Sequence, residues 1–173
     1  MAHKPPKEAI KEYRLAAAAT RSGDPEKALR HLRRTVAIDP GFLEAQNNLG
    51  ARLYQAGEYQ EATSHLQAAA DGDPSSPEIC ANLAVALAAT DREGEGERWA
   101  RRAFQLEPDS PKAQYVLAFI LAKQNRNLPE ALSLLERSVE RFPSARGLYA
   151  VLLRKDGQMD LAAEQMRRYG EGK

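Results

Sequence analysis

Two histidines recur at the same place in a sequence pattern that is repeated along the chain, and this recurrence suggests a metal site. His31 and His65 would have to reach one ion from two neighbouring units. Stacked helices lie about 8–10 Å apart, which is too far for both rings to share an ion. We therefore expect solvated, structural roles for the histidines and no bound metal.

The other reactive groups form no catalytic arrangement. Cys80 is the only cysteine, so no intrachain disulfide can form, and its place shortly before Leu83 favours a small buried hydrophobe. Gly94 and Gly96 lack the lysine and hydroxyl residue that complete a phosphate-binding loop. The sequence therefore predicts a protein that is not an enzyme and that holds no cofactor.

A repeat of about 34 residues, a period typical of solenoids and other repeat arrays, determines where all of these groups lie. Pro40, Pro74 and Pro108 follow one another at this period, and Pro143 comes one position later than the period would place it. The same period is kept by Leu15, Leu49, Leu83 and Leu117; by Ala16, Gly50, Ala84 and Ala118; by Ala19, Leu53, Leu87 and Leu121; and by Ala28, Ala62, Gly96 and Ala131.

Each unit is predicted to be a helix, a turn and a second helix. In the second unit Gly57 ends the first helix and Pro74 ends the second. In the fourth unit, Asn127 and Glu130 have the spacing of a capping box. The predicted helices are 7–22 and 25–38, 43–56 and 59–72, 77–90 and 94–106, 111–124 and 129–141, and 144–155 and 159–169.

Short motifs recur inside the units, and together they cover nearly the whole chain. The second unit has the fullest set, which is Leu49-Gly50, Gly57-Glu58-Tyr59 and Glu61-Ala62. The first unit keeps Leu15-Ala16 and Asp39-Pro40, and the third keeps Asn82-Leu83-Ala84 and Glu107-Pro108. The fourth unit has an extra residue in its inner turn.

This pattern resembles the tetratricopeptide repeat family, although Gln46 stands where that family usually has tryptophan. The pentatricopeptide family has a similar period and reads RNA, but the Leu-Gly and Glu-Ala motifs and the net charge of +1 favour the first resemblance. The resemblance implies an all-α, right-handed α-solenoid of antiparallel helix pairs. We expect one domain over 1–173, with repeats near 7–40, 43–74, 77–108, 111–143 and 144–170.

Charge and hydropathy exclude several classes of partner. Charged residues make up 28% of the chain and nearly balance, whereas nucleic-acid binding requires a basic excess. The first residues lack the apolar core of a signal peptide, and no apolar stretch is long enough to span a membrane. We therefore expect a soluble, cytoplasmic protein that binds no nucleic acid and does not insert in a membrane. A chain trimmed of an anchor would look the same.

The resemblance implies that the first helix of each unit lines a concave face. Asn48 and Asn82 recur at the same place in successive units, and in the family such asparagines bond to the backbone of an extended peptide. The alternative, that they bond locally to the adjacent helix, is left open. The candidate binding residues are Tyr13, Asn47, Asn48, Ala51, Tyr54, Asn82, Val85, Tyr115 and Phe119.

These residues predict an adaptor or scaffold that binds a partly apolar peptide or helix of another protein. One family mode, in which lysines and an arginine grip a C-terminal carboxylate, is not expected. The matching places around Asn48 hold Tyr13, Ala17, Glu78 and Asn82, and Glu78 would repel a carboxylate. Acidic chaperone tails are therefore not expected as partners.

Self-association is the alternative function. A solenoid requires polar end faces to remain monomeric. We expect the last helix to supply such a face through Glu164, Arg167 and Arg168. The first unit is rich in alanine over residues 16–19, so it could pair with another copy and form a homo-oligomer.

Overall fold

The computed structural model describes residues 3–171, and in that part of the chain the regular structure is entirely helical. Ten α-helices follow one another in the described residues, and one turn of 3₁₀ helix precedes the ninth. The expected all-α fold class is confirmed. The helices are α1 Lys7–Arg21, α2 Pro25–Ile38, α3 Leu43–Gln55, α4 Tyr59–Gly72, α5 Pro77–Ala89, α6 Glu93–Leu106, α7 Pro111–Lys123, α8 Leu128–Ser138, η1 Pro143–Ala145, α9 Arg146–Lys155 and α10 Met159–Glu171.

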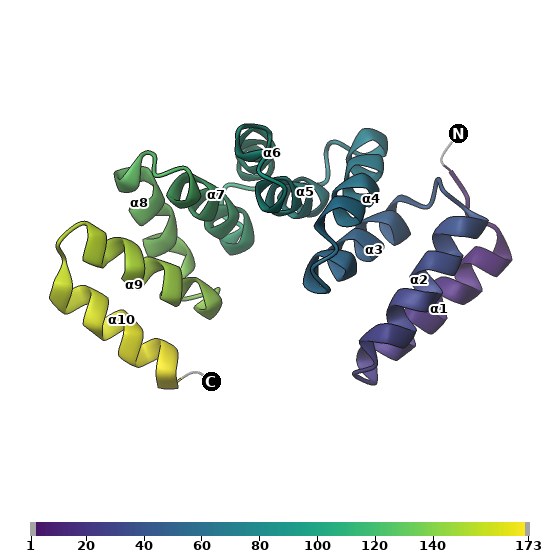
Figure 1. Cartoon of the computed structure of the whole chain (residues 1–173), viewed down its shortest axis with the longest axis horizontal. Coiled ribbons are helices and arrows are strands. Elements are labelled where there is room, and N and C mark those ends of the chain that lie inside the picture. Colours follow the sequence, from purple (N-terminus) through teal and green to yellow (C-terminus); the bar gives the residue numbers. More distant parts are fainter. Residues whose placement is uncertain (1–2, 172–173) are drawn as a thin grey trace.

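The helices stack in the order of the chain. Each helix packs on the next one, and short turns make the neighbours antiparallel. In addition, α5 contacts α3 and α7, which are the first helices of the adjacent units. Figure 1 shows the result as an arc that runs from α1 and α2 at one end to α9 and α10 at the other. The expected solenoid of helix pairs is therefore confirmed.

The observed helix bounds lie close to the predicted ones. The largest difference is at α8, which ends at Ser138 instead of at residue 141. The Ser138 carbonyl accepts from the backbone amides of Arg141 and Phe142, and this turn closes the helix. The division into five repeats at the residues given above stays a prediction.

The turn inside the helix pairs keeps one backbone conformation from the second unit to the fourth. Gly57 has a φ of 82°, in the left-handed region that glycine enters without strain. At the same place in the next two units, Asp91 has a φ of 58° and Asn125 a φ of 55°. Aspartate and asparagine are among the few other residues that tolerate this region. The turn is thus preserved in the two units that lack the glycine.

The capping box expected at the start of α8 is wrong. Asn127 itself has a φ of 46°, and its side chain bonds to no backbone amide of the helix. Its amide nitrogen instead donates to Oε2 of Glu130 at 2.6 Å. The extra residue of this turn places Asn127 in a second left-handed position, which directs its side chain away from the helix end.

Small and leucine residues form the seams between the helices. The repeated leucines Leu49, Leu83 and Leu117 are fully buried, as the pattern predicts. Gly96 lies close to the backbone of the neighbouring helix, because a Cβ at this position would lie 2.9 Å from the carbonyl oxygen of Ala84. Helix α6 therefore packs against α5 at a distance that no larger residue at 96 would permit without movement.

The two histidines have partners within their own units, and the expected solvated role is wrong. His31 Nδ1 lies 2.7 Å from Oε2 of Glu12, and His65 Nδ1 lies 2.6 Å from Oε1 of Gln46. The sequence separation is the same in both pairs, and it places the two side chains opposite each other on paired helices. In the described residues, no three histidine, cysteine, aspartate or glutamate side chains form a group that could hold a metal ion.

A glutamine at the place of the family's usual tryptophan connects two of the units to the loop before them. Gln46 Nε2 donates to the carbonyl of Pro40 at 2.9 Å, and Gln114 Nε2 donates to the carbonyl of Pro108 at 2.8 Å. Both glutamines are buried. Their amides thus satisfy a carbonyl of the loop that precedes each unit.

Arginines connect second helices that belong to successive units. Arg33 on α2 pairs with Glu61 on α4, with its Nη2 donating to Oε2 at 3.0 Å. Arg101 on α6 pairs with Glu130 on α8 through Nη1 and Oε1 at 2.9 Å. Each of these ion pairs therefore bridges two units on the side of the second helices.

The charged residues expected on the last helix are at its surface, because Arg167 and Arg168 are exposed and Glu164 is partly exposed. Glu164 and Arg168 pair with each other at 2.9 Å. Apolar side chains are exposed on this helix as well, and Met159 and Met166 are 58% and 48% exposed. At the other end, two of the four alanines of residues 16–19 are buried inside the first unit.

Candidate functional site

The nine candidate residues lie on four first helices of the solenoid. Eight of them are partly exposed, and the ninth, Asn47, is buried, with its Oδ1 accepting from Nδ2 of Asn82 at 2.9 Å. A side chain that forms the seam between α3 and α5 is not available to a ligand. The candidates are Tyr13 on α1; Asn47, Asn48, Ala51 and Tyr54 on α3; Asn82 and Val85 on α5; and Tyr115 and Phe119 on α7.

A depression of about 420 Å³ lies between α1 and α3, and it brings three of the candidates together. Its floor is formed by alanines and a leucine, and its rim is polar. The candidates at this depression are Tyr13, Asn48 and Ala51. The other lining residues are Ala16, Ala17, Thr20, Arg21, Leu32, Arg52 and Gln55.

Hydrogen bonds fix the polar rim of this depression. The hydroxyl of Tyr13 donates to Oε1 of Glu44 at 2.8 Å and accepts from Nδ2 of Asn48 at 2.6 Å. Burial raises the pKa of Tyr13 well above its ordinary value, and the hydrogen bond to Glu44 raises it further. The phenol therefore keeps its proton and continues to donate to the Glu44 carboxylate throughout the neutral range.

The second repeated asparagine is also bonded across a seam. Asn82 donates to Asn47, and its Oδ1 accepts from Nζ of Lys112 at 2.9 Å. Asn48 and Asn82 thus both form the local bonds that were left open as an alternative. Whether they also bond to a peptide stays a prediction, and a peptide would have to share or replace these partners.

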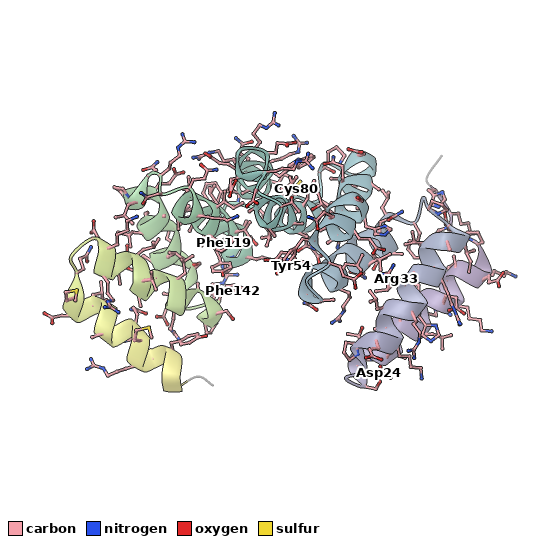
Figure 2. All side chains as sticks on the ribbon, in the orientation of Figure 1. Asp24, Arg33, Tyr54, Cys80, Phe119 and Phe142 are labelled. Atoms are coloured by element: carbon pink, nitrogen blue, oxygen red, sulfur yellow. The ribbon has the colours of Figure 1, made fainter. Side chains whose placement is uncertain are left out.

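Aromatic side chains gather on the inner side of the arc. The ring of Tyr115 lies 6.3 Å from that of Phe119 and 5.3 Å from that of Phe142, measured between centroids. Tyr54 faces the same hollow from α3 (Figure 2), and its ring lies 5.3 Å from that of Tyr59, measured between centroids. Figure 2 shows Tyr54, Phe119 and Phe142 facing the hollow of the arc. We refer to Tyr54, Tyr115, Phe119 and Phe142 as the aromatic cluster.

Phe142 was missed as a candidate, although the repeat holds a signal for it. The residue before the repeated proline is acidic in the first three units, where it is Asp39, Asp73 and Glu107. In the fourth unit this place is taken by Phe142. Phe142 thus departs from the repeat, and its packing onto Tyr115 explains the departure.

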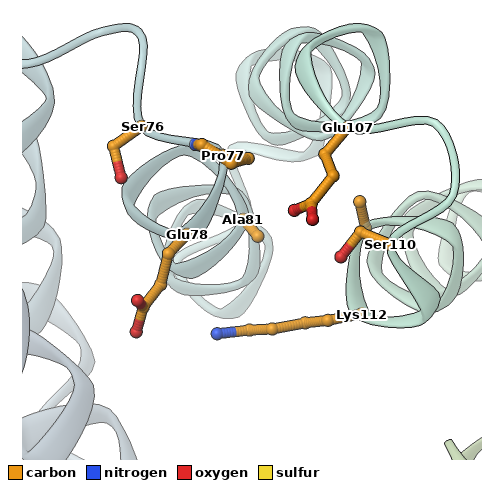
Figure 3. Close-up of a pocket in the computed structure, with 8 residues that line it drawn as sticks. Ser76, Pro77, Glu78, Ala81, Glu107, Ser110 and Lys112 are labelled. Atoms are coloured by element: carbon orange, nitrogen blue, oxygen red, sulfur yellow. The ribbon is translucent and has the colours of Figure 1, made fainter.

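A second depression, of about 520 Å³, lies where α5 and α7 begin, and Figure 3 shows it. It is charged rather than apolar. Glu78 and Glu107 are exposed, and neither forms an ion pair with another residue in the described part of the chain. Lys112 extends across from α7 toward α5, where it reaches Asn82. Glu107 belongs to the repeated acidic position before the proline, but it was not among the candidate binding residues.

The only thiol of the chain is inaccessible. Cys80 is fully buried, as expected for a small hydrophobe, and burial raises the pKa of its thiol. Its Sγ lies 3.5 Å from the carbonyl oxygen of Pro74.

None of the described helices is long and apolar enough to cross a membrane.

Solved structures share this fold over nearly the full chain. TTC0263, a tetratricopeptide repeat protein of Thermus thermophilus, is 18% identical and has a TM-score of 0.80, with 94% of this chain and 90% of that chain covered. MamA from Desulfovibrio magneticus RS-1 is 17% identical with a TM-score of 0.76 over 97% and 96% of the two chains. YrrB, described as a tetratricopeptide repeat protein with an unusual peptide-binding site, is 20% identical with a TM-score of 0.67 over 93% and 84%. These likenesses confirm the expected superhelix.

Sequence comparison gives the family. Among curated proteins, none matches this sequence. One tetratricopeptide repeat model matches residues 13–77 and 116–172, and a second model of the same name matches residues 53–102. Domains of this kind generally mediate contacts between proteins. Since the first model alone covers more than half of the sequence, and the helix pairs stack as such repeats do, the chain belongs to the tetratricopeptide repeat family.

Proposed function

We propose that this protein is a non-enzymatic adaptor that holds a partly apolar segment of another protein against its first helices. The aromatic cluster is the observation that carries the proposal. Its rings are partly exposed, come from α3, α7 and the loop after α8, and face the hollow of the arc. Partly exposed aromatic groups that converge on one surface commonly serve as anchors for a partner.

The chemistry of the surface changes along its length, and the change indicates which kinds of residue a partner would place at each part. The aromatic cluster suits apolar side chains, whereas the depression between α1 and α3 has an alanine floor and polar groups at its rim. A bound segment would place apolar residues on the cluster and polar or backbone groups near Tyr13 and Arg52. Contacts of this kind typically give micromolar affinity, or about −8 kcal/mol. YrrB, which has a similar fold, is described by its peptide-binding site.

Acidic tails remain unsuitable ligands in this proposal. Glu44 lies at the rim of the first depression, where its carboxylate accepts from Tyr13. Glu78 is exposed beside the second depression. Two carboxylates near the asparagines would repel a C-terminal carboxylate at neutral pH. A micromolar complex with an acidic chaperone tail would overturn this part of the proposal.

The test is the capture of partners by immobilised protein from the native lysate, with Phe119→Glu as the disabling variant. The substitution places a charge in the middle of the aromatic cluster. We expect at least one protein to be retained by the parent chain and lost from the variant. Its binding segment, made as a peptide, should then bind the parent at least tenfold more tightly than the variant in calorimetry.

Leu106→Glu is the matched control, because Leu106 is an exposed apolar residue at the end of a second helix and lies outside the cluster. Both variants should give the helical circular dichroism spectrum of the parent. The proposal fails if the captured proteins are retained equally by Phe119→Glu and the parent. It also fails if Leu106→Glu loses them to the same extent.

A further inference from the structure

One exposed side of α10 carries an apolar stripe, next to the exposed charges of Asp160 and Arg167. Met159, Ala163 and Met166 are spaced by four and three positions, so they lie on one side of the helix, and all three are exposed. The two methionines are the most exposed large apolar side chains of this helix. A stripe with this spacing is typical of a helix face that packs on another helix.

The repeat shows what this stripe would contact. Counted from the repeated alanine of the second helix, Met166 corresponds to Leu32, Leu66, Ala100 and Leu135. Each of those residues is buried, and in each case a further unit follows along the solenoid. Met166 is the one member of this series whose neighbour is not supplied by the described part of the chain. The position is therefore one that a neighbouring helix covers in the other four units.

The first helix of a second copy does not suit this place. In the second to fourth units, the first helix presents a small or apolar residue to the preceding unit, at Ala45, Ile79 and Ala113, which are buried. In α1 the same position is Lys11, which is exposed. Head-to-tail stacking would bury this ammonium group against the methionines, at a high desolvation cost.

A second α10 suits it well, because the flank of the stripe is self-complementary. Asp160 and Arg167 are one heptad apart, exposed and on the same flank of the stripe. Neither forms an ion pair with any other side chain that the structure describes. When two copies of one helix pack antiparallel about a two-fold axis, a flank meets the same flank of the partner. Opposite charges on one flank can then pair twice.

We propose that two copies of this protein associate through their α10 helices, packed antiparallel about a two-fold axis that passes between Ala163 and Glu164. The small Ala163 lies at the centre and permits an interaxial distance of about 8–10 Å. Met159 and Met166 fill the two sides of the seam. Asp160 of each copy pairs with Arg167 of the other. The contact involves one helix from each copy, so the dimer is weak and dissociates on dilution.

Sedimentation velocity of the full chain over roughly 1–300 μM tests the proposal. We expect the average mass to rise with concentration toward that of a dimer. Met166→Glu should weaken association at least tenfold, because it places two like charges in the seam. Val151→Glu is the matched control, since Val151 is 59% exposed on the neighbouring α9, and it should leave association unchanged.

Exchanging the charges of Asp160 and Arg167 gives the sharper test, because its result depends on which residues face each other across the two-fold axis. Asp160→Arg and Arg167→Asp should each weaken association severalfold. The double variant carries the same charges in exchanged places, so it should recover most of the parent affinity. Recovery is expected only if residue 160 of one copy faces residue 167 of the other.

A thiol at the centre gives an independent readout. Cys80 is buried, so in Ala163→Cys the added thiol is the accessible one, and it should form a symmetric disulfide dimer under mild oxidation. The proposal is overturned if the parent remains monomeric at the top of the concentration range, if association is insensitive to Met166→Glu, or if the double charge variant fails to recover it. An anionic vesicle or acidic peptide that binds α10 without dimer formation would also overturn it.

Discussion

The seams that join the first three units contain asparagine hydrogen bonds beside their apolar clusters, whereas the next seam is apolar at the same place. One repeated position, the residue just before the seam leucine, shows this directly. It is Asn48 in the second unit and Asn82 in the third, where both amides bond across to the preceding unit. In the fourth unit it is Val116, which is buried in a continuous apolar cluster that extends to α10.

The difference shows how one solenoid combines rigidity with an exact alignment of its helices along the seams. An apolar seam contributes in proportion to the area it buries and tolerates small shifts along the helices. A hydrogen-bonded seam contributes only about 1 kcal/mol for each bond, but it requires one alignment of donors and acceptors. The apolar clusters along the solenoid therefore supply most of the stability, and the hydrogen bonds of the N-terminal seams fix the geometry around the first depression.

The largest expected effect comes from removing an apolar seam residue. Leu117→Ala opens a cavity at a fully buried site in the large cluster and should lower the free energy of unfolding by about 2–5 kcal/mol. Urea unfolding followed by circular dichroism measures the loss. Leu106→Ala, at an exposed site, should cost less than about 0.5 kcal/mol. A loss below about 1 kcal/mol for Leu117→Ala would refute the claim that the apolar seams dominate.

A smaller effect is expected in the polar seam. Tyr13→Phe and Asn48→Ala both remove the bond between the phenol oxygen and the asparagine amide. In a double-mutant cycle, the two changes should show a coupling free energy of about 0.5–1.5 kcal/mol. The same unfolding measurement applies. Additive effects would mean that the two side chains contribute independently and that this bond does not connect the units.

The smallest effect concerns acid. The hydrogen bond from His31 holds the pKa of Glu12 below its ordinary value. A carboxyl group with a lowered pKa in the folded state stabilises the fold above its unfolded pKa, and this contribution is lost as the pH falls below about 4. Glu12→Gln reproduces the Gln46 and His65 pair of the next unit and removes the ionisation.

Thermal melts from pH 7 to pH 3 measure this effect. Over the acid part of the range, we expect the melting temperature of the parent to fall further than that of Glu12→Gln, by a few degrees at most. Glu136→Gln, at an exposed site on α8, is the control and should follow the parent. Parallel curves for the parent and Glu12→Gln would show that the carboxylate contributes nothing specific.

The fold could be predicted from the sequence because its signals are local and repeated. The period, the leucine columns and Gly57 depend only on spacing along one or two helices, and spacing is visible in the printed chain. Pairings between helices were not visible. Glu12 and His31 meet because of how α1 and α2 cross, and Asn47 is buried although its neighbour Asn48 is not. Adjacent positions point about 100° apart on a helix, so the helix crossing decides which of them faces the seam.

The end faces show the same limit. Glu164, Arg167 and Arg168 made the last helix look polar, but Met159 and Met166 are exposed on the same helix. The composition of a helix does not reveal which of its sides the fold leaves uncovered. Phe142 was missed for a related reason, because its contact with Tyr115 depends on a loop.

The arginines that connect the second helices give the arc a preferred direction of bending. Arg33 links α2 to α4, and Arg101 links α6 to α8. An arc that curls more tightly around its first helices draws its second helices apart and stretches these links. An arc that flattens slackens them. The ion pairs thus resist tighter curling, whereas flattening is opposed by the packing of the first helices on one another.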